Sequence, residues 1–243
     1  YNYLINFIDD SSIDGSWSKI KKLSEKHKEV KGIQLSRNFG HQAAIDAGVS
    51  NFSSDALIIM DGDLQDDPKY IPSLIKEWEQ GNKIVLAKRI KRYDGVIRKF
   101  LFNIYFNLQS LTSDIQIPKY VGHFSLLDKV AVEELKNFPE KIKFFNGLRA
   151  YLGFPTSHIE VIKNKRYKGK TKMSYSKLFN LGFDGIFGFT TKPLTFIGIL
   201  GIIISGASLL LPLVSVFNRN FNLDFETDIL ILFFLSGVQL LAL

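Results

Sequence analysis

Apolar and polar residues follow two alternating patterns along the first part of the chain. Short runs rich in β-branched residues predict buried strands, and segments whose apolar residues recur every three or four positions predict amphipathic helices. Such alternation is typical of an α/β domain with a mostly parallel sheet covered by helices. We predict strands at 4–8, 32–36, 56–60, 84–88 and 123–128, and helices at 16–29, 41–50 and 71–81.

Two further segments have helical patterns with a strongly apolar side. Residues 95–111 are crowded with Phe and Tyr and carry two early cations, which suits a helix lying at a membrane interface. A helix buried in the protein core would have the same pattern, so both interpretations stay open. Residues 174–189 predict a second amphipathic helix, next to the membrane.

The C-terminal part of the chain has a different hydropathy pattern. The segment 194–217 contains 24 residues and no charge, and about 20 apolar residues suffice to cross a bilayer. We predict a transmembrane helix there, with a buried core helix as the alternative. The 15 residues at 229–243 predict a second, truncated transmembrane helix, or a re-entrant or interfacial segment. These patterns divide the chain into an α/β domain (1–173), a juxtamembrane helix (174–193) and a transmembrane region (194–243).

Charge is spread unevenly between these parts. The chain carries 31 Lys and Arg against 24 Asp and Glu, a net charge of +7. Residues 1–193 hold 30 of the cations and 21 of the acids, which gives +9, whereas residues 194–243 carry −2. Six basic residues fall within 163–172, shortly before the predicted spans. By the positive-inside rule the α/β domain faces the cytoplasm, so we expect a multi-pass protein of the cell (inner) membrane.

The composition also excludes several kinds of site. The chain has no cysteine, which excludes a disulfide framework, a thiolate metal site and a cysteine nucleophile. An isoelectric point of about 9.3 would suit a nucleic-acid-binding protein. The basic cluster, however, adjoins a predicted span, and no nucleic-acid-binding motif is present. We therefore expect no nucleic-acid partner.

Aspartates stand at the ends of two predicted strands. Asp9 and Asp10 follow the first strand, and Asp61 and Asp63 follow the third. The carboxyl ends of parallel strands share one edge of a sheet, where such folds bind ligands, so we expect these four side chains to gather there. Asp61 and Asp63, with Gln65 as a neutral oxygen ligand, would suit Mg²⁺ or Mn²⁺. An acidic, solvated turn is the alternative, because Asp-Gly is a common turn dipeptide.

Six sequence motifs together resemble one protein family. Over nearly its whole length the chain is similar to family 2 glycosyltransferases of the dolichol-phosphate mannose synthase and bactoprenol glucosyltransferase branch. Each motif alone is weakly specific, but six in the family's order are strongly specific. They are IDDSSIDGS (8–16), LSRNFGHQAAIDAG (35–48), MDGDLQDDP (60–68), GHFSLLD (122–128), NGLRAYLG (146–153) and RYKGKTKMS (166–174).

The resemblance implies a fold and a reaction. It implies a GT-A domain over residues 1–173 that moves a sugar from a nucleotide diphosphate to a polyprenyl phosphate, with inversion at the anomeric carbon. The bactoprenol branch favours UDP-glucose as the donor, with GDP-mannose second, and an undecaprenyl (bactoprenyl) phosphate acceptor. A divalent cation, Mg²⁺ or Mn²⁺, and assembly into a homo-oligomer are implied as well.

Acidic residues receive roles from the same resemblance. Asp61 and Asp63 match the family's metal-binding DxD, and Gln65 follows as an extra metal ligand. Asp9 and Asp10 match the acidic pair that contacts the nucleotide, and Asp61 contributes to nucleotide-sugar binding through the metal.

Basic residues receive roles at the phosphate groups. Arg166 and Lys172 match a basic motif near the diphosphate and the acceptor, and they complete the expected catalytic set with the DxD pair. Arg89 and Arg98 fall where family members place cations for the lipid phosphate. A phosphate monoester has a second pKa of about 6, so it is ionised at neutral pH and already nucleophilic. A strong general base is therefore less needed than for a hydroxyl acceptor.

The chain departs from the family pattern at two places. It opens at Tyr1, near the family's second strand, so we expect the first strand and its nucleotide-binding loop to be missing. Where members often carry Gly-Asp-Phe-Arg, this chain has Gly122-His123-Phe124-Ser125. Both the acidic and the cationic side chain are absent from that motif, so we assign no catalytic base.

Two other functions remain as alternatives. A membrane-anchored module could bind a nucleotide-sugar without turning it over. A processive polysaccharide synthase would share the fold and the DxD. That group usually carries Gln-x-x-Arg-Trp, however, and neither Trp17 nor Trp78 stands in such a context.

Overall fold

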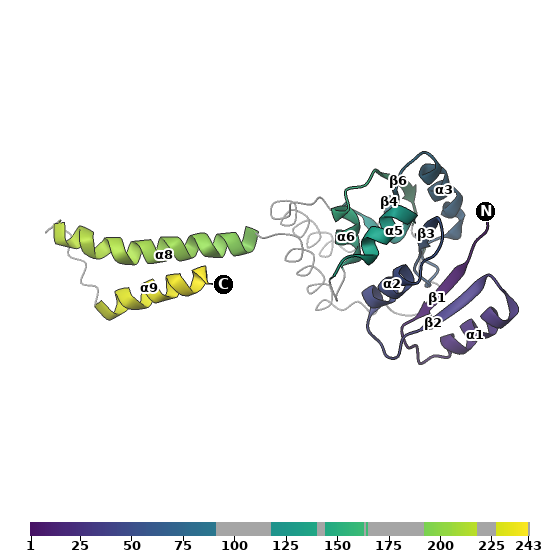
Figure 1. Ribbon diagram of the computed structural model, residues 1–243, viewed down its shortest axis with the longest axis horizontal. Helices are drawn as coiled ribbons and strands as arrows, with labels where there is room; N and C mark the ends of the chain where they lie inside the picture. Colours follow the sequence, from purple (N-terminus) through teal and green to yellow (C-terminus); the bar gives the residue numbers. More distant parts are fainter. Residues whose placement is uncertain (91–117, 140–143, 163, 165–191, 218–226, 243) are drawn as a thin grey trace. The chain divides into compact units, whose positions relative to one another are not determined.

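The computed structural model describes residues 1–90, 118–139, 144–162, 164, 192–217 and 227–242 (Figure 1). The chain divides into two compact units. One unit contains strands β1 to β6 and the helices that accompany them, and the other contains helices α8 and α9. The helices predicted at 95–111 and 174–189 lie outside the described residues.

The first two strands form a small parallel sheet joined by one helix. Helix α1 lies against β2 where Gly32 stands: a Cβ atom there would meet Ile20 Cγ2 of α1 at 2.6 Å. Only a residue without a side chain lets the helix approach this closely. The elements are β1 (Ile5–Asp9), α1 (Ser16–Lys26) and β2 (Val30–Gln34).

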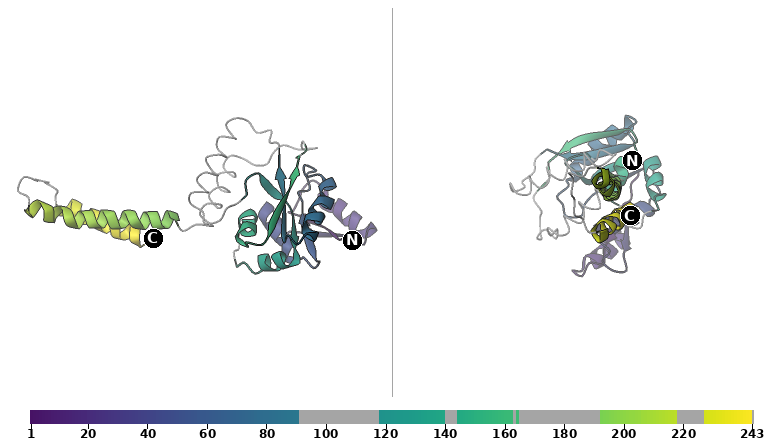
Figure 2. Two further views of the ribbon diagram at one scale, coloured as in Figure 1. Left: turned by 90° about the horizontal axis from the view of Figure 1, so that it is seen from above. Right: turned by 90° about the vertical axis from the view of Figure 1, so that its left-hand side faces the viewer.

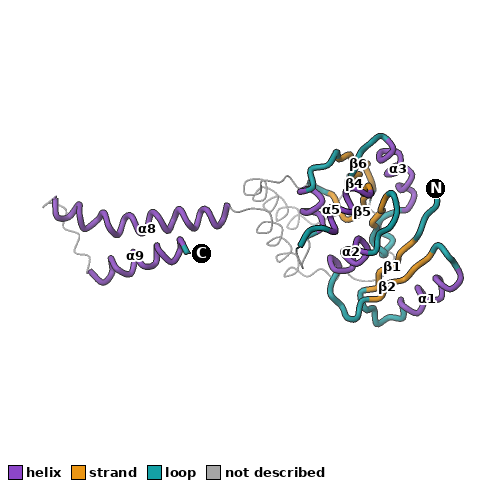
Figure 3. Tube along the Cα trace, in the orientation of Figure 1, coloured by secondary structure: helices purple, strands orange, loops and turns teal. Residues whose placement is uncertain are grey.

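The second sheet has four strands in the order β3-β5-β4-β6. Figure 3 labels three of them, β4, β5 and β6. Strand β5 runs antiparallel to both β3 and β4, whereas β4 and β6 are parallel. The strands are β3 (Ala56–Ile59), β4 (Ile84–Arg89), β5 (Val121–Asp128) and β6 (Thr156–Val161).

Helices cover both faces of this four-stranded sheet (Figure 2). On one face, Leu74 of α3 is fully buried in a cluster with Val85 of β4 and Phe124 of β5. Neighbouring residues of a strand point to opposite faces, and on the other face Ser125 of β5 meets Arg149 of α6. The helices of this unit that follow β2 are α2 (His41–Ser50), the 3-10 helix η1 (Pro68–Tyr70), α3 (Ile71–Glu79), α5 (Lys129–Lys136) and α6 (Phe145–Tyr151).

The sequence-based prediction of an α/β domain is confirmed, but the prediction of a mostly parallel sheet is wrong. Each of the five predicted strands is present, and so is each of the three helices predicted at 16–29, 41–50 and 71–81, with ends shifted by up to three residues. The sheet is mixed because β5 is antiparallel to both of its neighbours. Buried apolar runs do not encode strand direction, and β5 is buried along most of its length, which resembles a parallel strand.

The second unit is a pair of antiparallel helices, α8 (Lys192–Phe217) and α9 (Thr227–Leu241). Small residues let the two backbones approach closely: a Cβ atom on Gly201 would lie 2.7 Å from the Gly237 carbonyl oxygen. Ser205 Oγ also lies 3.5 Å from the Phe234 carbonyl oxygen. Among the helices within the described residues, none has both the length and the apolar character that crossing a membrane requires. The predicted spans at 194–217 and 229–243 stay predictions.

Candidate active site

The acidic bend that follows β3 is a tight turn with a strained backbone. The backbone N–H of Gln65 donates to Asp63 Oδ1 (3.1 Å), an arrangement in which an aspartate closes its own turn. Leu64 has a φ of 60°, an uncommon conformation for a residue with a branched side chain. Backbone strain of this kind is concentrated at functional sites. The bend therefore holds the side chains of Asp61 and Asp63 in a defined place beyond the strand.

The end of β1 places a second pair of carboxylates. Asp9 is buried, with 4% of its surface exposed. Its Oδ2 accepts hydrogen bonds from the backbone N–H of Ser12 (3.2 Å) and from Gln34 Nε2 (3.3 Å). Ser11 in between has a φ of 56°. Asp9 is thus fixed by its own loop and by β2.

Asp10 ties the end of β1 to the beginning of α2. Its two carboxylate oxygens accept the backbone N–H groups of Phe39 (2.7 Å) and Gly40 (2.9 Å). Gly40 immediately precedes α2 and has a φ of 96°, a conformation that glycine adopts at little cost. These two hydrogen bonds fix the position of His41, the first residue of α2.

His41 connects the two acidic groups. Its Nε2 lies 3.0 Å from Asp61 Oδ1, in hydrogen-bonding contact. This hydrogen bond raises the pKa of His41; partial burial acts in the opposite direction, and the negative charges of Asp61, Asp10 and Asp63 add to the increase. The structure therefore brings three of the four aspartates that were expected to gather, Asp10, Asp61 and Asp63, near one histidine. The strands they follow, β1 and β3, belong to different sheets and not to one shared edge. His41 itself was not predicted, although it stands within the LSRNFGHQAAIDAG motif.

His123 packs against His41 and is uncharged at neutral pH. The two imidazole rings are 4.6 Å apart between centroids and tilted by 52°. Burial lowers the pKa of His123 to about 3, and the positive charges of His41, Arg149 and Arg89 contribute to the decrease. Its Nδ1 is buried and has no hydrogen-bond partner among the described residues. At neutral pH this side chain thus adds no charge to the site.

We expect His123 to make the folded protein less stable in acid. Its pKa in the folded state is about 3 and about 6.5 in an unfolded chain, so between these values the unfolded state binds the extra proton. Unfolding is then favoured by up to about 1.4 kcal/mol per pH unit as the pH falls below 6.5. His123→Asn should remove this contribution.

The test compares the thermal midpoints of the full-length wild type and His123→Asn at pH 7 and pH 5. The wild type should lose more stability than the variant between the two values. Parallel losses in both proteins would contradict a buried, neutral His123.

Two arginines flank the beginning of β5. Arg89, at the end of β4, lies so close to Gly122 that any side chain at position 122 would collide with its guanidinium group. Arg149 is buried in α6 and donates to Ser125 Oγ (2.8 Å) and to the Gly122 carbonyl oxygen (3.1 Å). Burial lowers the pKa of Arg149 to about 9, so it is still charged at neutral pH. Arg89 was predicted from the sequence, and Arg149 was not.

Gln65 links the acidic bend to the segment after β6. Its Nε2 donates to the Asn164 carbonyl oxygen (3.4 Å), and its own carbonyl oxygen accepts the Asn164 N–H (2.9 Å). The three remaining predicted site residues, Arg98, Arg166 and Lys172, lie outside the described residues. Asn164 directly precedes the basic stretch that contains two of them.

The donor set on the acidic bend fits a hard divalent cation. Within the described residues, no three His, Cys, Asp or Glu side chains form a metal-binding cluster. Mg²⁺, however, is usually bound by one or two carboxylates, with water and substrate phosphates as its other ligands. Asp61 and Asp63 would supply those carboxylates, and the Gln65 amide would supply a neutral oxygen.

Fold and candidate site together define an α/β protein whose acidic side chains follow the carboxyl ends of β1 and β3, the kind of position where α/β folds bind ligands. The sequence pattern described as "Glycosyl transferase family 2" matches residues 1–136. The chain belongs to this family, and it is a glycosyltransferase. Its mixed α/β architecture is accordingly GT-A-like.

Several relatives match the whole chain. It is 34% identical to the "Uncharacterized glycosyltransferase YkcC" of Bacillus subtilis (strain 168), over 100% of this chain and 76% of the relative. It is also 34% identical to the "Bactoprenol glucosyl transferase" of Shigella phage SfX, over 100% of this chain and 81% of the relative. Among solved structures, it is similar to a mannosyltransferase from Pyrobaculum calidifontis in complex with GDP-Man and Mn²⁺. That match has a TM-score of 0.47 and 16% identity, over 69% of this chain and 48% of the other.

Proposed function

We propose that this glycosyltransferase moves glucose from UDP-glucose to a polyprenyl phosphate, with a divalent cation and inversion at the anomeric carbon. The relatives named as bactoprenol glucosyl transferases support glucose as the sugar and a polyprenyl acceptor. The observation that carries the proposal is the convergence of Asp10, Asp61 and Asp63 on His41. Three negative charges close together at the ends of β1 and β3 are stabilised when a cation binds there together with a nucleotide-sugar.

The acidic residues of the site are proposed to bind the donor and its cation. Asp61 and Asp63, with Gln65, would hold the cation, which stabilises the negative charge that develops on the diphosphate leaving group. Asp9 and Asp10 hold the nucleotide. His41, hydrogen-bonded to Asp61, fixes the orientation of that carboxylate, in the way that outer-shell partners orient metal ligands.

The acceptor side requires positive charge rather than a base. The polyprenyl phosphate is ionised at neutral pH and attacks the anomeric carbon through a phosphate oxygen, while the bond from that carbon to the nucleoside diphosphate breaks. Two phosphate groups must approach each other in this step, so cations have to offset their repulsion. Arg89 and Arg98 are proposed for the acceptor phosphate, and Arg166 and Lys172 for the diphosphate.

Attachment to the membrane is part of the proposal. It is supported by the 24 uncharged residues at 194–217 and by the basic stretch at 163–172, which would be attracted to anionic lipid headgroups by about 1 kcal/mol per cation. A catalytic domain on the cytoplasmic surface of the cell membrane would meet its lipid acceptor in two dimensions. Retention of the protein in the membrane pellet after an alkaline wash supports this location, and release into the supernatant contradicts it.

The experiment that tests the reaction uses full-length protein, undecaprenyl phosphate and Mn²⁺, with radiolabelled UDP-glucose, GDP-mannose or a UDP-N-acetylhexosamine. We expect label in the lipid fraction with UDP-glucose. Donor binding by calorimetry without labelled lipid would instead indicate a binding module. Label in a polymer would indicate a polysaccharide synthase.

A further inference from the structure

Arg149 is a buried cation whose hydrogen-bond acceptors among the described residues are all uncharged. Only 4% of its surface is exposed. Within the described part of the chain, its guanidinium group donates to the Ser125 hydroxyl, the Gly122 carbonyl and the Asn146 side-chain oxygen. A buried charge without an opposite charge is costly. The burial of the Arg149 charge therefore points to a role beyond packing.

The position of Arg149 coincides with a departure from the family motif. This chain has Gly122-His123-Phe124-Ser125 at the place where the resemblance described above leads us to expect Gly-Asp-Phe-Arg. Arg149 Nη1 lies 2.8 Å from Ser125 Oγ, the side chain that stands in place of the motif's arginine. The positive charge absent from β5 is thus supplied from α6 at the same point of the strand.

The acidic residue of the motif is not replaced in the same way. His123 is neutral, with a pKa lowered to about 3 by burial and neighbouring positive charges. The beginning of β5 consequently carries one more positive charge than an Asp and Arg pair would give. Gly122 lies between two guanidinium groups, with Arg89 against its Cα and Arg149 on its carbonyl oxygen.

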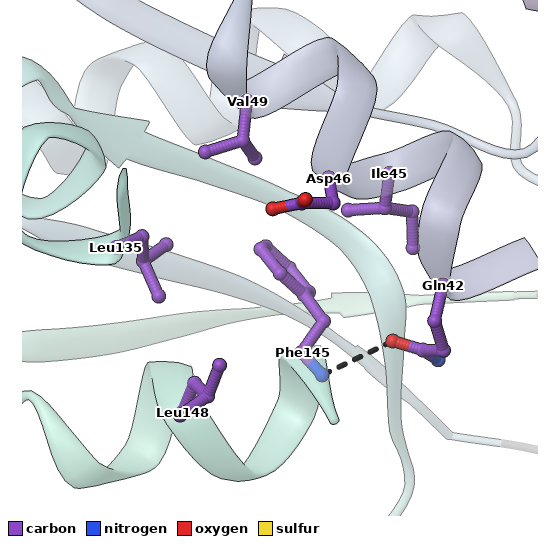
Figure 4. A pocket seen from close by; sticks show the side chains of 7 residues that line it. All are labelled: Gln42, Ile45, Asp46, Val49, Leu135, Phe145 and Leu148. Atoms are coloured by element: carbon purple, nitrogen blue, oxygen red, sulfur yellow. Dashed lines mark hydrogen bonds between the residues drawn. The ribbon is translucent and has the colours of Figure 1, made fainter. Parts of the chain in front are cut away.

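Helix α6 is also tied by a hydrogen bond to α2, the helix that begins with His41. The backbone N–H of Phe145, at the start of α6, donates to Gln42 Oε1 of α2 (3.1 Å). Figure 4 shows this hydrogen bond beside a pocket between the two helices and α5. Gln42 follows His41, which contacts Asp61. Helix α2 therefore contacts both the start of α6, the helix that carries Arg149, and the acidic bend. The pocket is lined by Gln42, Ile45, Asp46, Val49, Leu135, Phe145 and Leu148.

We propose that Arg149 is a positioning residue for sugar transfer. From α6, and together with Ser125, it takes the place of the arginine expected in the Gly-Asp-Phe-Arg motif. Its hydrogen bond to the Gly122 carbonyl oxygen also fixes the backbone against which the Arg89 guanidinium group packs. This proposal rests on the proposed function, in which Arg89 binds the phosphate monoester of the lipid acceptor. Without Arg149, the Gly122 backbone loses its hydrogen bond and Arg89 loses its fixed support. The acceptor phosphate then binds in a less productive position, while the nucleotide-sugar is unaffected.

The test compares Arg149→Lys and Arg149→Met in the full-length protein, because both side chains are long and flexible and only lysine keeps the charge. We expect Arg149→Met to lower kcat/KM for undecaprenyl phosphate about 30-fold or more, the scale of one buried charged hydrogen bond. Arg149→Lys should stay within about fivefold of the wild type. The calorimetric Kd for UDP-glucose with Mn²⁺ should be unchanged in both.

A relocation variant distinguishes positioning from packing. Arg149→Leu alone should be impaired, and Ser125→Arg combined with Arg149→Leu should recover kcat/KM about tenfold by returning the cation to β5. Equal losses in the Lys and Met variants at wild-type thermal midpoints would overturn the proposal, and so would a folded double variant no better than Arg149→Leu.

If Arg149→Met does not fold, the Arg149→Lys variant decides the test. Activity within fivefold of the wild type supports the proposal, and a 30-fold loss with normal stability contradicts it. An inactive wild type would overturn the proposed function as well, whereas an active wild type with an equally active Met variant overturns this inference alone.

Discussion

Replacing Asp61 or Asp63 with asparagine should lower kcat for sugar transfer by about 1,000-fold. Asparagine keeps the size of the side chain and removes the negative charge that holds the cation. A bound metal contributes several kcal/mol to charge stabilisation in the transition state, and each 1.36 kcal/mol corresponds to a factor of ten in rate. Removal of divalent cations with EDTA should give a loss of similar size in the wild type, and added Mn²⁺ should reverse it.

The measurement is transfer of labelled glucose to undecaprenyl phosphate by each full-length variant. Asp55→Asn is the matched control, because Asp55 is exposed and precedes the opposite end of β3; its activity should stay within about twofold of the wild type. Thermal midpoints show whether each variant is folded. If both Asp61→Asn and Asp63→Asn keep full activity, the assignment of the metal ligands is wrong.

Asp10→Ala should have the second-largest effect, a loss of about 100-fold in kcat/KM for the nucleotide-sugar. The substitution removes a carboxylate expected to contact the nucleotide. It also removes the hydrogen bonds of the exposed Phe39 N–H and the partly buried Gly40 N–H, each of which contributes about 1 kcal/mol. The start of α2 is then released, and His41 no longer orients Asp61.

Steady-state kinetics with varied donor and fixed acceptor test this prediction. Asp10→Asn should lose less than Asp10→Ala, because its amide oxygen can still accept one of the two hydrogen bonds. Asp14→Ala serves as the control from the same loop: this side chain is exposed and accepts hydrogen bonds from Ser16, two residues further along the chain. An Asp10→Ala enzyme with a normal donor KM would show that Asp10 has neither role.

Much of the fold was predictable because its strands are short apolar runs bounded by polar turns. Strand β6 was missed because four of its six side chains are hydrophilic and it begins with three polar residues, so it has no apolar run. Helices α5 and α6 were missed because each has only two turns, which is too short for a clear period. The direction of β5 could not be read from a run that is buried along most of its length.

The acidic part of the site was predictable from one rule, that functional side chains follow strand ends. The basic and aromatic part was not, because its contacts join residues far apart in the sequence. His41 meets Asp61 across 20 positions, and Arg149 meets Ser125 across 24. One signal was present: a single arginine within the apolar segment that contains NGLRAYLG, together with the altered Gly-His-Phe-Ser motif.

The most direct test of the account is a crystal structure with UDP-glucose and Mn²⁺, with anomalous diffraction recorded at the manganese edge. We predict one manganese peak within bonding distance of carboxylate oxygens of Asp61 and Asp63 and of the donor's diphosphate. A nucleotide bound with the acidic bend empty, or a peak elsewhere on the protein, would contradict the account.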